Sequence, residues 1–86
     1  MNTLFLLMAR HEGRAVLPPD VVCKEYFAPL TLPVFMRKLN EGEIPLPLVR
    51  LDRSQKGPKV IDIRDLAAYI DQQREAAAKE LRQLRA

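Results

Sequence analysis

The sequence is short of thiols and imidazoles, because its 86 residues include one cysteine, Cys23, and one histidine, His11. A single thiol cannot form an intramolecular disulfide, and a zinc site needs about four Cys, His or carboxylate ligands. We therefore expect a reducing compartment, no structural metal and no cofactor. Cys23 is interpreted as a small buried hydrophobic side chain. His11 has neither a nucleophile nor a set of ligands at a useful spacing.

Glycines and long apolar runs are also scarce. Three glycines leave no glycine-rich loop for a nucleotide phosphate. The apolar run from Leu4 to Ala9 is too short for a secretory signal and lacks a basic flank, and a membrane-spanning helix needs about 18 or more apolar residues. A chain of this length forms one modest core and has few apolar residues left to enclose a catalytic cleft. The sequence therefore predicts a soluble binding protein that is not an enzyme.

The net charge of +3 is modest, and its distribution along the chain is more informative than its size. Residues 1–30 and residues 61–86 each hold equal numbers of basic and acidic side chains. The excess lies between Thr31 and Val60, in six basic residues: Arg37, Lys38, Arg50, Arg53, Lys56 and Lys59. One basic segment between two neutral ones is typical of a chain that meets a polyanion. A merely soluble surface is the alternative.

Two short helices are expected in the first third of the chain. Apolar residues at helical spacing predict one over residues 3–11, with a strand as the alternative: Leu4, Leu7 and Met8. After a strand fragment at residues 15–17, two prolines begin a second helix over residues 19–27, because proline fits a first helical turn. The apolar side of this helix holds four residues: Val22, Cys23, Tyr26 and Phe27.

A third helix is predicted over residues 31–41. Thr31 is placed to cap its first turn, and Asn40 with Gly42 ends it. Its apolar residues follow the i, i+3, i+4, i+7 template: Leu32, Phe35, Met36 and Leu39. Two helices of about nine residues separated by a short turn match a helix-turn-helix.

The segment after the third helix indicates a basic hairpin. Residues 44–51 are apolar but contain Pro45 and Pro47, which favours an edge strand. Residues 53–57 form a polar turn that ends in a glycine, and residues 59–61 return as the second strand.

The last third predicts one long helix, with Asp62 as its cap and Asp65 in the position of a capping-box partner. Its buried stripe holds four residues: Ile63, Leu66, Ala67 and Ile70. Residues 72–86 form a helical extension that either projects into solvent or packs on a partner subunit. The expected fold class is α+β, mainly helical. We expect a small winged helix-turn-helix with a two-stranded wing and a long C-terminal helix, in a single domain of residues 1–86.

Resemblance to a known family rests on five blocks in order along the chain: Met1-Asn-Thr-Leu-Phe-Leu-Leu-Met-Ala9, Val22-Cys-Lys-Glu-Tyr-Phe27, Leu46-Pro-Leu-Val-Arg50, Ser54-Gln-Lys56 and Asp65-Leu-Ala-Ala-Tyr69. With these blocks the sequence resembles the pyocin activator protein PrtN family over nearly its whole length. The resemblance implies a transcriptional activator that binds DNA upstream of bacteriocin or phage-tail-like gene clusters. The order of helices and hairpin is also similar to phage excisionases and MerR-type winged domains, a likeness of architecture.

We therefore expect a sequence-specific, DNA-binding activator of bacteriocin or prophage-type genes. The recognition helix, residues 31–41, enters the major groove, and the wing, residues 50–59, contacts the backbone or the minor groove. Arg37 is the candidate base reader, because a guanidinium pairs with guanine O6 and N7, whereas Lys38 suits a phosphate. The candidate DNA-binding residues are Thr31, Val34, Arg37, Lys38, Arg50, Arg53, Ser54, Gln55, Lys56 and Lys59.

Plainer interpretations and rival functions stay open. Arg37 and Lys38 can be the solvated side of an amphipathic helix, and the hairpin charges can protect a sheet edge. An excisionase-like architectural protein would use the same fold to bend DNA, and a phage-encoded modulator would bind a host protein instead. Expected partners are double-stranded DNA and RNA polymerase, with a homodimer left open, and the expected location is the cytoplasm, at the nucleoid. The DNA-binding hypothesis requires the six basic residues to share one surface beside the third helix.

Overall fold

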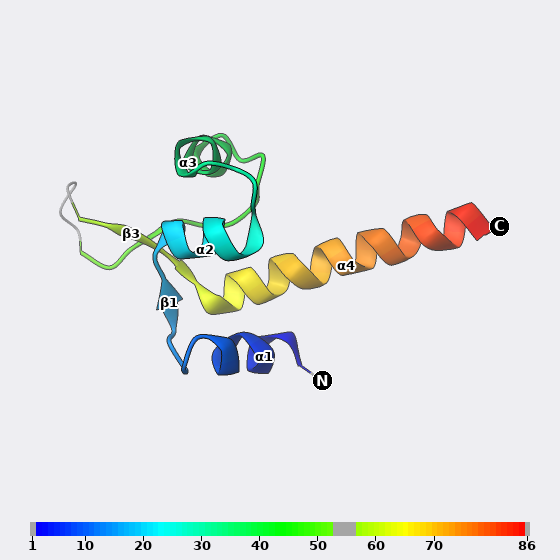
Figure 1. Ribbon diagram of the computed structural model, residues 1–86, viewed down its shortest axis with the longest axis horizontal. Helices are drawn as coiled ribbons and strands as arrows, with labels where there is room; N and C mark the ends of the chain where they lie inside the picture. Colours follow the sequence, from blue (N-terminus) through cyan, green and yellow to red (C-terminus); the bar gives the residue numbers. More distant parts are fainter. Residues whose placement is uncertain (1, 53–56, 86) are drawn as a thin grey trace.

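The computed structural model describes residues 2–52 and 57–85. The elements in these residues follow the order α1 (Thr3–Arg10), β1 (Val16–Leu17), α2 (Pro19–Tyr26), α3 (Leu32–Asn40), β2 (Val49–Arg50), β3 (Lys59–Asp62) and α4 (Ile63–Arg85). The sheet and the first three helices gather around the first half of α4, and the second half of α4 projects away from them (Figure 1). The predicted mainly helical α+β fold with a long C-terminal helix is confirmed.

The strand β3 lies at the centre of an antiparallel sheet with the order β1-β3-β2. In the register, Leu17 of β1 is the partner of Ile61, and Arg50 of β2 is the partner of Lys59. The pairing of β2 with β3 agrees with the predicted hairpin. The sequence did not predict that β1 would pair with β3, because a fragment of two residues has no pattern that identifies its partner.

The strand predicted over residues 44–51 is wrong for most of its length, since only Val49–Arg50 is a strand. Pro45 and Pro47 have no N–H group to donate to a neighbouring strand. Ile44 and Leu46 are nevertheless buried, and the backbone N–H of Leu46 donates to the carbonyl of Ile44 over 2.8 Å. The apolar residues of this segment therefore belong to an irregular stretch of chain that fills the core.

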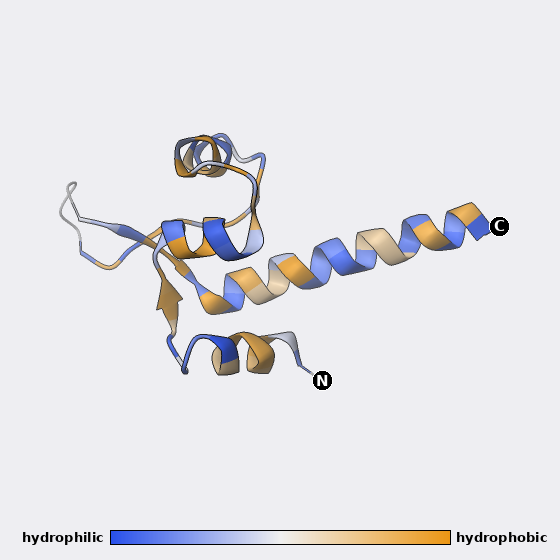
Figure 2. Cartoon of the chain, in the orientation of Figure 1, coloured by the Kyte–Doolittle hydropathy of each residue, from blue (hydrophilic) through white to orange (hydrophobic). Residues whose placement is uncertain are grey.

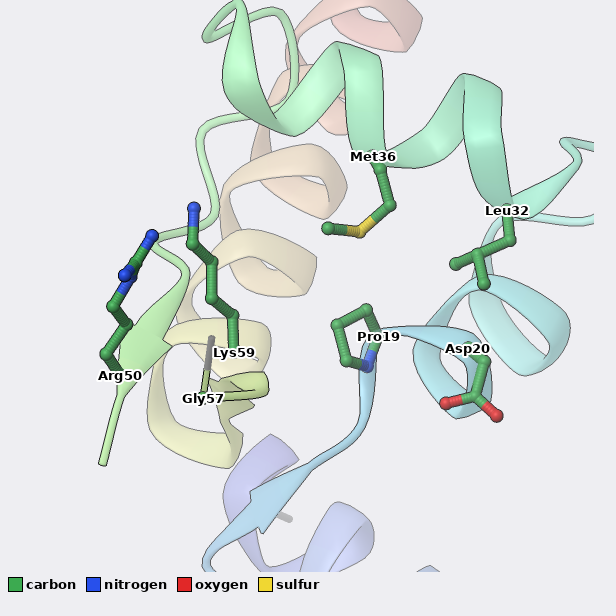
Figure 3. Close-up of a pocket in the computed structure, with 7 residues that line it drawn as sticks. All are labelled: Pro19, Asp20, Leu32, Met36, Arg50, Gly57 and Lys59. Atoms are coloured by element: carbon green, nitrogen blue, oxygen red, sulfur yellow. The ribbon is translucent and has the colours of Figure 1, made fainter. Parts of the chain in front are cut away.

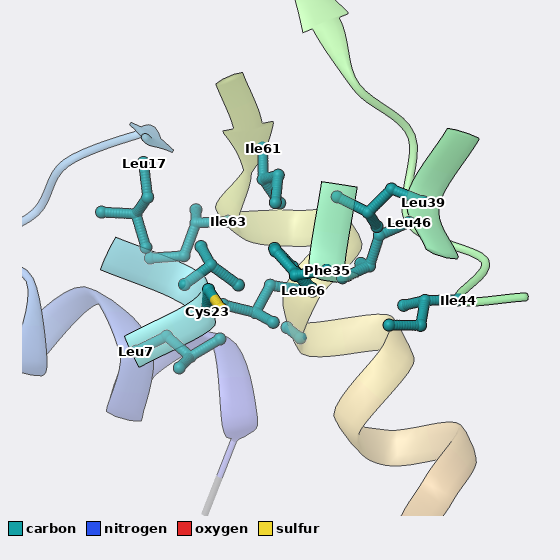
Figure 4. Packing of buried hydrophobic residues seen from close by; sticks show 12 residues of the cluster. Leu7, Leu17, Cys23, Phe35, Leu39, Ile44, Leu46, Ile61, Ile63 and Leu66 are labelled. Carbon is teal, nitrogen blue, oxygen red and sulfur yellow. The ribbon is translucent and has the colours of Figure 1, made fainter. Parts of the chain in front are cut away.

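The core lies between α2, α3, the sheet and the first turns of α4, with α1 covering its lower side (Figure 4). Its buried members are Leu7, Leu17, Val22, Cys23, Phe35, Leu39, Ile44, Leu46, Ile61, Ile63, Leu66 and Ala67. The rings of Phe27 and Phe35 pack with their centroids 4.7 Å apart. Cys23 is a buried free thiol, as predicted, and its Sγ donates to the carbonyl of Leu30.

The ends of α1 and α3 are fixed in different ways. The Asn2 side chain accepts a hydrogen bond of 2.8 Å from the backbone N–H of Leu4, which supports a helix over the alternative strand. Thr31 precedes α3, but its side chain makes no capping hydrogen bond, so the predicted cap is wrong. One of the amides that a cap would reach belongs to Pro33, which has no N–H. At the far end, Gly42 turns the chain with φ +78°.

A partly buried polar pair, His11 and Tyr26, joins the end of α1 to α2. His11 is 8% exposed, and its Nε2 lies 2.7 Å from the Tyr26 hydroxyl and 3.3 Å from a carboxylate oxygen of Glu25. Burial raises the pKa of the Tyr26 hydroxyl, and the charge of Glu25 adds to this effect. Arg10 also contacts Glu25. The histidine that had no assigned role in the sequence thus satisfies polar groups where two helices meet.

Asp62 connects the sheet to α4 without an intervening residue. Its carboxylate accepts a 2.8 Å hydrogen bond from the backbone N–H of Arg64 and two more from the Arg64 guanidinium. The hydrogen bonds from the Arg64 side chain hold the pKa of Asp62 below its ordinary value. The predicted cap of the last helix is therefore confirmed.

Replacing Tyr26 by phenylalanine is expected to lower the free energy of unfolding by about 1 kcal/mol, because buried His11 loses a hydrogen-bond partner. Chemical denaturation monitored by circular dichroism measures the change. Tyr69→Phe is the matched control, since the Tyr69 ring packs on Phe27 but its hydroxyl makes no hydrogen bond within the described residues. Equal losses in the two variants would contradict the assignment.

Asp62→Asn is expected to reduce stability at neutral pH, and its difference from the natural chain should shrink in acid. The Asp62 pKa is lower in the folded chain than its ordinary 3.8, so the carboxylate stabilises the fold above that pH. This contribution is lost as the pH falls through the lowered pKa. Thermal unfolding of both chains at pH values from neutral to strongly acidic tests the sign, and a difference independent of pH would contradict it.

Candidate nucleic-acid interface

An open groove of about 490 Å³ separates α3 from the strands β2 and β3 (Figure 3). Its lining residues come from α2, α3 and the sheet: Pro19, Asp20, Leu32, Met36, Arg50, Gly57 and Lys59. We call it the wing groove. Figure 3 shows Arg50 and Lys59 next to each other on one side, with Leu32 and Met36 of α3 on the other. The groove thus has one basic wall and one apolar wall, and the acidic side chain of Asp20 lies on the side of Leu32.

Arg50 and Lys59 are direct partners in the antiparallel register of β2 and β3. Like charges opposite each other on neighbouring strands repel and destabilise the pair. Neither side chain forms an ion pair within residues 2–52 and 57–85. An anion in the wing groove would relieve this repulsion, and a phosphate is an anion that both side chains can contact.

The two basic residues of α3 do have acidic partners. Arg37 lies 3.4 Å from Glu41, one turn further along α3, and its side chain is more than half exposed. The ammonium of Lys38 donates to Glu43 over 2.9 Å, and this hydrogen bond lowers the pKa of the Glu43 carboxyl. Both pairs lie at the surface, where an ion pair contributes roughly 0–1 kcal/mol.

Helix geometry places these two residues on different flanks of α3. Successive residues are about 100° apart around a helix, so Lys38 lies about 200° from Met36, which lines the wing groove. Arg37 lies about 100° from Met36, on the outer face. The expectation that the basic residues share one surface is therefore wrong for the four that the structure describes: Arg50 and Lys59 are together, Arg37 is on the neighbouring face and Lys38 is on the far flank. A DNA contact that used all four would have to involve both sides of α3, not one docking face.

The other predicted contact residues divide into two groups. Thr31 is exposed just before α3, and Val34 is partly buried in its first turn. Arg53, Ser54, Gln55 and Lys56 lie outside the described residues.

Sequence reasoning missed the apolar wall of the wing groove. Leu32 belongs to the predicted apolar side of the third helix but is 41% exposed, because Phe35 and Leu39 form the buried face of α3 and Leu32 lies at its edge. Pro19 and Asp20 also line the groove, at the start of α2. The helical pattern contained Leu32 and Met36, but the pattern alone does not distinguish a core position from the wall of an open groove.

Residues 2–52 and 57–85 give no support for a membrane-spanning helix or for a metal site. No helix there has the length and apolar character needed to cross a bilayer. No cluster of His, Cys, Asp or Glu side chains in that part of the chain has the arrangement of a metal site.

Comparison of the chain with known proteins gives one family. No curated protein and no solved structure matches it. A family model described as pyocin activator protein PrtN matches residues 3–77, from the start of α1 into the second half of α4. This span includes α2, α3, both strands beside the wing groove and most of the remaining fold. The chain therefore belongs to the pyocin activator protein PrtN family.

Proposed function

We propose that this protein is a sequence-specific activator that binds double-stranded DNA through α3 and the wing. Family membership supports the role of a transcriptional activator of pyocin genes. The succession of α2, a short turn, α3 and the β2–β3 pair is the order of a winged helix-turn-helix. In that motif the second helix lies in the major groove, so α3 is the recognition helix of the proposal.

The wing groove is the observation that carries the proposal. When a helix occupies the major groove, a phosphate strand runs along each side of it. In our proposal, one such strand occupies the wing groove, where Arg50 and Lys59 donate to its phosphates. Leu32 and Met36 then face sugar rings and thymine methyl groups, which are the apolar parts of the duplex. The opposed Arg50 and Lys59, which form no ion pair among the described residues, are then neutralised by the phosphates of the complex.

The outer face of α3 would supply base recognition. Arg37 leaves Glu41 at little cost, because a solvent-exposed ion pair is weak, and its guanidinium can then make two hydrogen bonds to guanine. Thr31 and Val34 lie at the start of the same helix and contact the groove edge. Lys38, on the far flank, contacts the second phosphate strand. The wing residues Arg53, Ser54, Gln55 and Lys56 extend the contact to the backbone or the minor groove.

Changing Arg50 and Lys59 together to glutamine is expected to weaken binding to all DNA sequences alike and to reduce the magnitude of the salt slope by about 2. The natural chain, with about five phosphate contacts, should have a slope of log affinity against log salt near −4 to −5. Fluorescence anisotropy with a duplex selected from a random pool measures both.

The matched control removes two positive charges from the projecting part of α4, as Lys79→Gln with Arg82→Gln. Its salt slope should stay near that of the natural chain. If the two double variants lose the same affinity, the wing groove is not the DNA contact, and a natural chain that binds no selected duplex would refute the function itself.

Arg37→Lys should relax the preference for one guanine by about 1–3 kcal/mol, because an ammonium cannot reproduce the two parallel hydrogen bonds. Sequencing of duplexes selected by each variant reads this out directly. Lys38→Arg keeps the charge of its position and is expected to select the same sequences as the natural chain. An unchanged consensus for Arg37→Lys would assign base reading to other residues.

A further inference from the structure

The projecting half of α4 carries an apolar stripe that no described residue covers. Ala77, Leu81 and Leu84 continue the helical face of Ile70, and Leu81 and Leu84 are 51% and 84% exposed. Figure 2 shows apolar bands returning along α4 well beyond its contact with α1. Exposed leucines on a helix with no contact are unfavourable in water, since burial of each side chain is worth about 1.5–3 kcal/mol.

An apolar groove lies at the inner end of the same stripe. It has a volume of about 310 Å³ and lies between the end of α2 and the first half of α4. Its lining is mostly aromatic and aliphatic: Tyr26, Phe27, Leu66, Tyr69, Ile70 and Gln73. We call it the aromatic groove. Ile70 belongs both to this groove and to the face of α4 that continues into the stripe.

The spacing of these residues makes α4 complementary to itself. Ile70 and Leu84 are each seven residues from Ala77, and Gln73 and Leu81 are each four residues from it. A two-fold axis at Ala77 therefore pairs two α4 helices in opposite directions, with Leu84 of one copy beside Ile70 of the other. The same axis brings Leu81 beside Gln73, so both leucines of each copy reach the aromatic groove of the other.

Side-chain size and charge agree with this register. Ala76, Ala77 and Ala78 lie at the crossing point, where small side chains let two helices approach closely. The register also brings Arg85 of one copy within two residues, about 3 Å along the axis, of the level of Asp71 in the other, on the same edge of the contact. Opposite charges at this edge favour the antiparallel pair.

We propose that two copies of this chain associate through α4, antiparallel about Ala77, with Leu81 and Leu84 seated in the partner's aromatic groove. The leucines and the groove that receives them lie on one helix at matching distances, which favours a second copy over an unrelated protein. The contact is closed, because the same surface serves both copies. It uses neither α3 nor the wing, so it stands independently of the proposed DNA contact.

Analytical ultracentrifugation of the full chain at a series of concentrations tests the association. The natural chain should sediment as a concentration-dependent dimer, and Leu84→Asp as a monomer, because a carboxylate cannot enter the apolar groove. Gln83→Asp adds the same charge about 100° around α4 from Leu84, away from the apolar stripe, and should remain dimeric. A natural chain that stays monomeric throughout, or equal association of the two variants, would overturn the proposal.

Crosslinking tests the direction of the pair. A mixture of Gln73→Cys and Leu81→Cys chains should form a mixed dimer with a short bismaleimide, whereas either variant alone places its cysteines about 12 Å apart along the axis and should react poorly. The natural chain, whose single Cys23 is buried, is the control. Efficient crosslinking of Gln73→Cys with itself would indicate parallel helices and refute the antiparallel register.

Discussion

Backbone pairing along both edges of β3 positions every other part of this fold. On one edge β3 holds β1, which is joined to α2 through Pro18 alone, and on the other it holds β2, which carries Arg50. The fully buried side chain of Ile61 anchors the strand, at a gain of about 1.5–3 kcal/mol. Since α4 begins at the next residue after β3, the strand also sets the direction of the long helix. The wing groove and the aromatic groove are thus both placed relative to one strand of four residues.

The basic side chains of α3 and those of the strands β2 and β3 differ in whether they have acidic partners. The basic side chains of the helix are each paired with an acidic side chain four or five residues along the chain. The basic side chains of the strands face each other without such a partner among the described residues. Among the described residues, Arg50 and Lys59 are therefore more available to an anion than the paired Arg37 and Lys38, although sequence reasoning placed its main emphasis on the helix. A phosphate strand bound there would leave Arg37 free to act in recognition.

Local patterns in the sequence were sufficient to predict the positions of the helices and the family of the chain. Helical periodicity located α1, α2, α3 and the start of α4, because each buries one face in the same core. The resemblance to the PrtN family is confirmed by the family model over residues 3–77. Pairings between distant segments were not predictable in the same way. The contact of β1 with β3, the burial of His11 against Tyr26 and the exposure of Leu32 all depend on which elements become neighbours, and no local pattern records that.

The direct passage from β3 into α4 has a mechanical consequence. A helix that follows a strand with no loop, and whose first turn is held by Asp62, has no flexible connection through which to swing relative to the sheet. Whatever attaches to its outer end is held at a fixed distance and a fixed angular phase from α3. Each residue between Ile63 and Ala77 adds about 1.5 Å of length and about 100° of rotation. Insertions or deletions in this stretch would therefore turn the outer surface away from its present direction, even where they leave the helix intact.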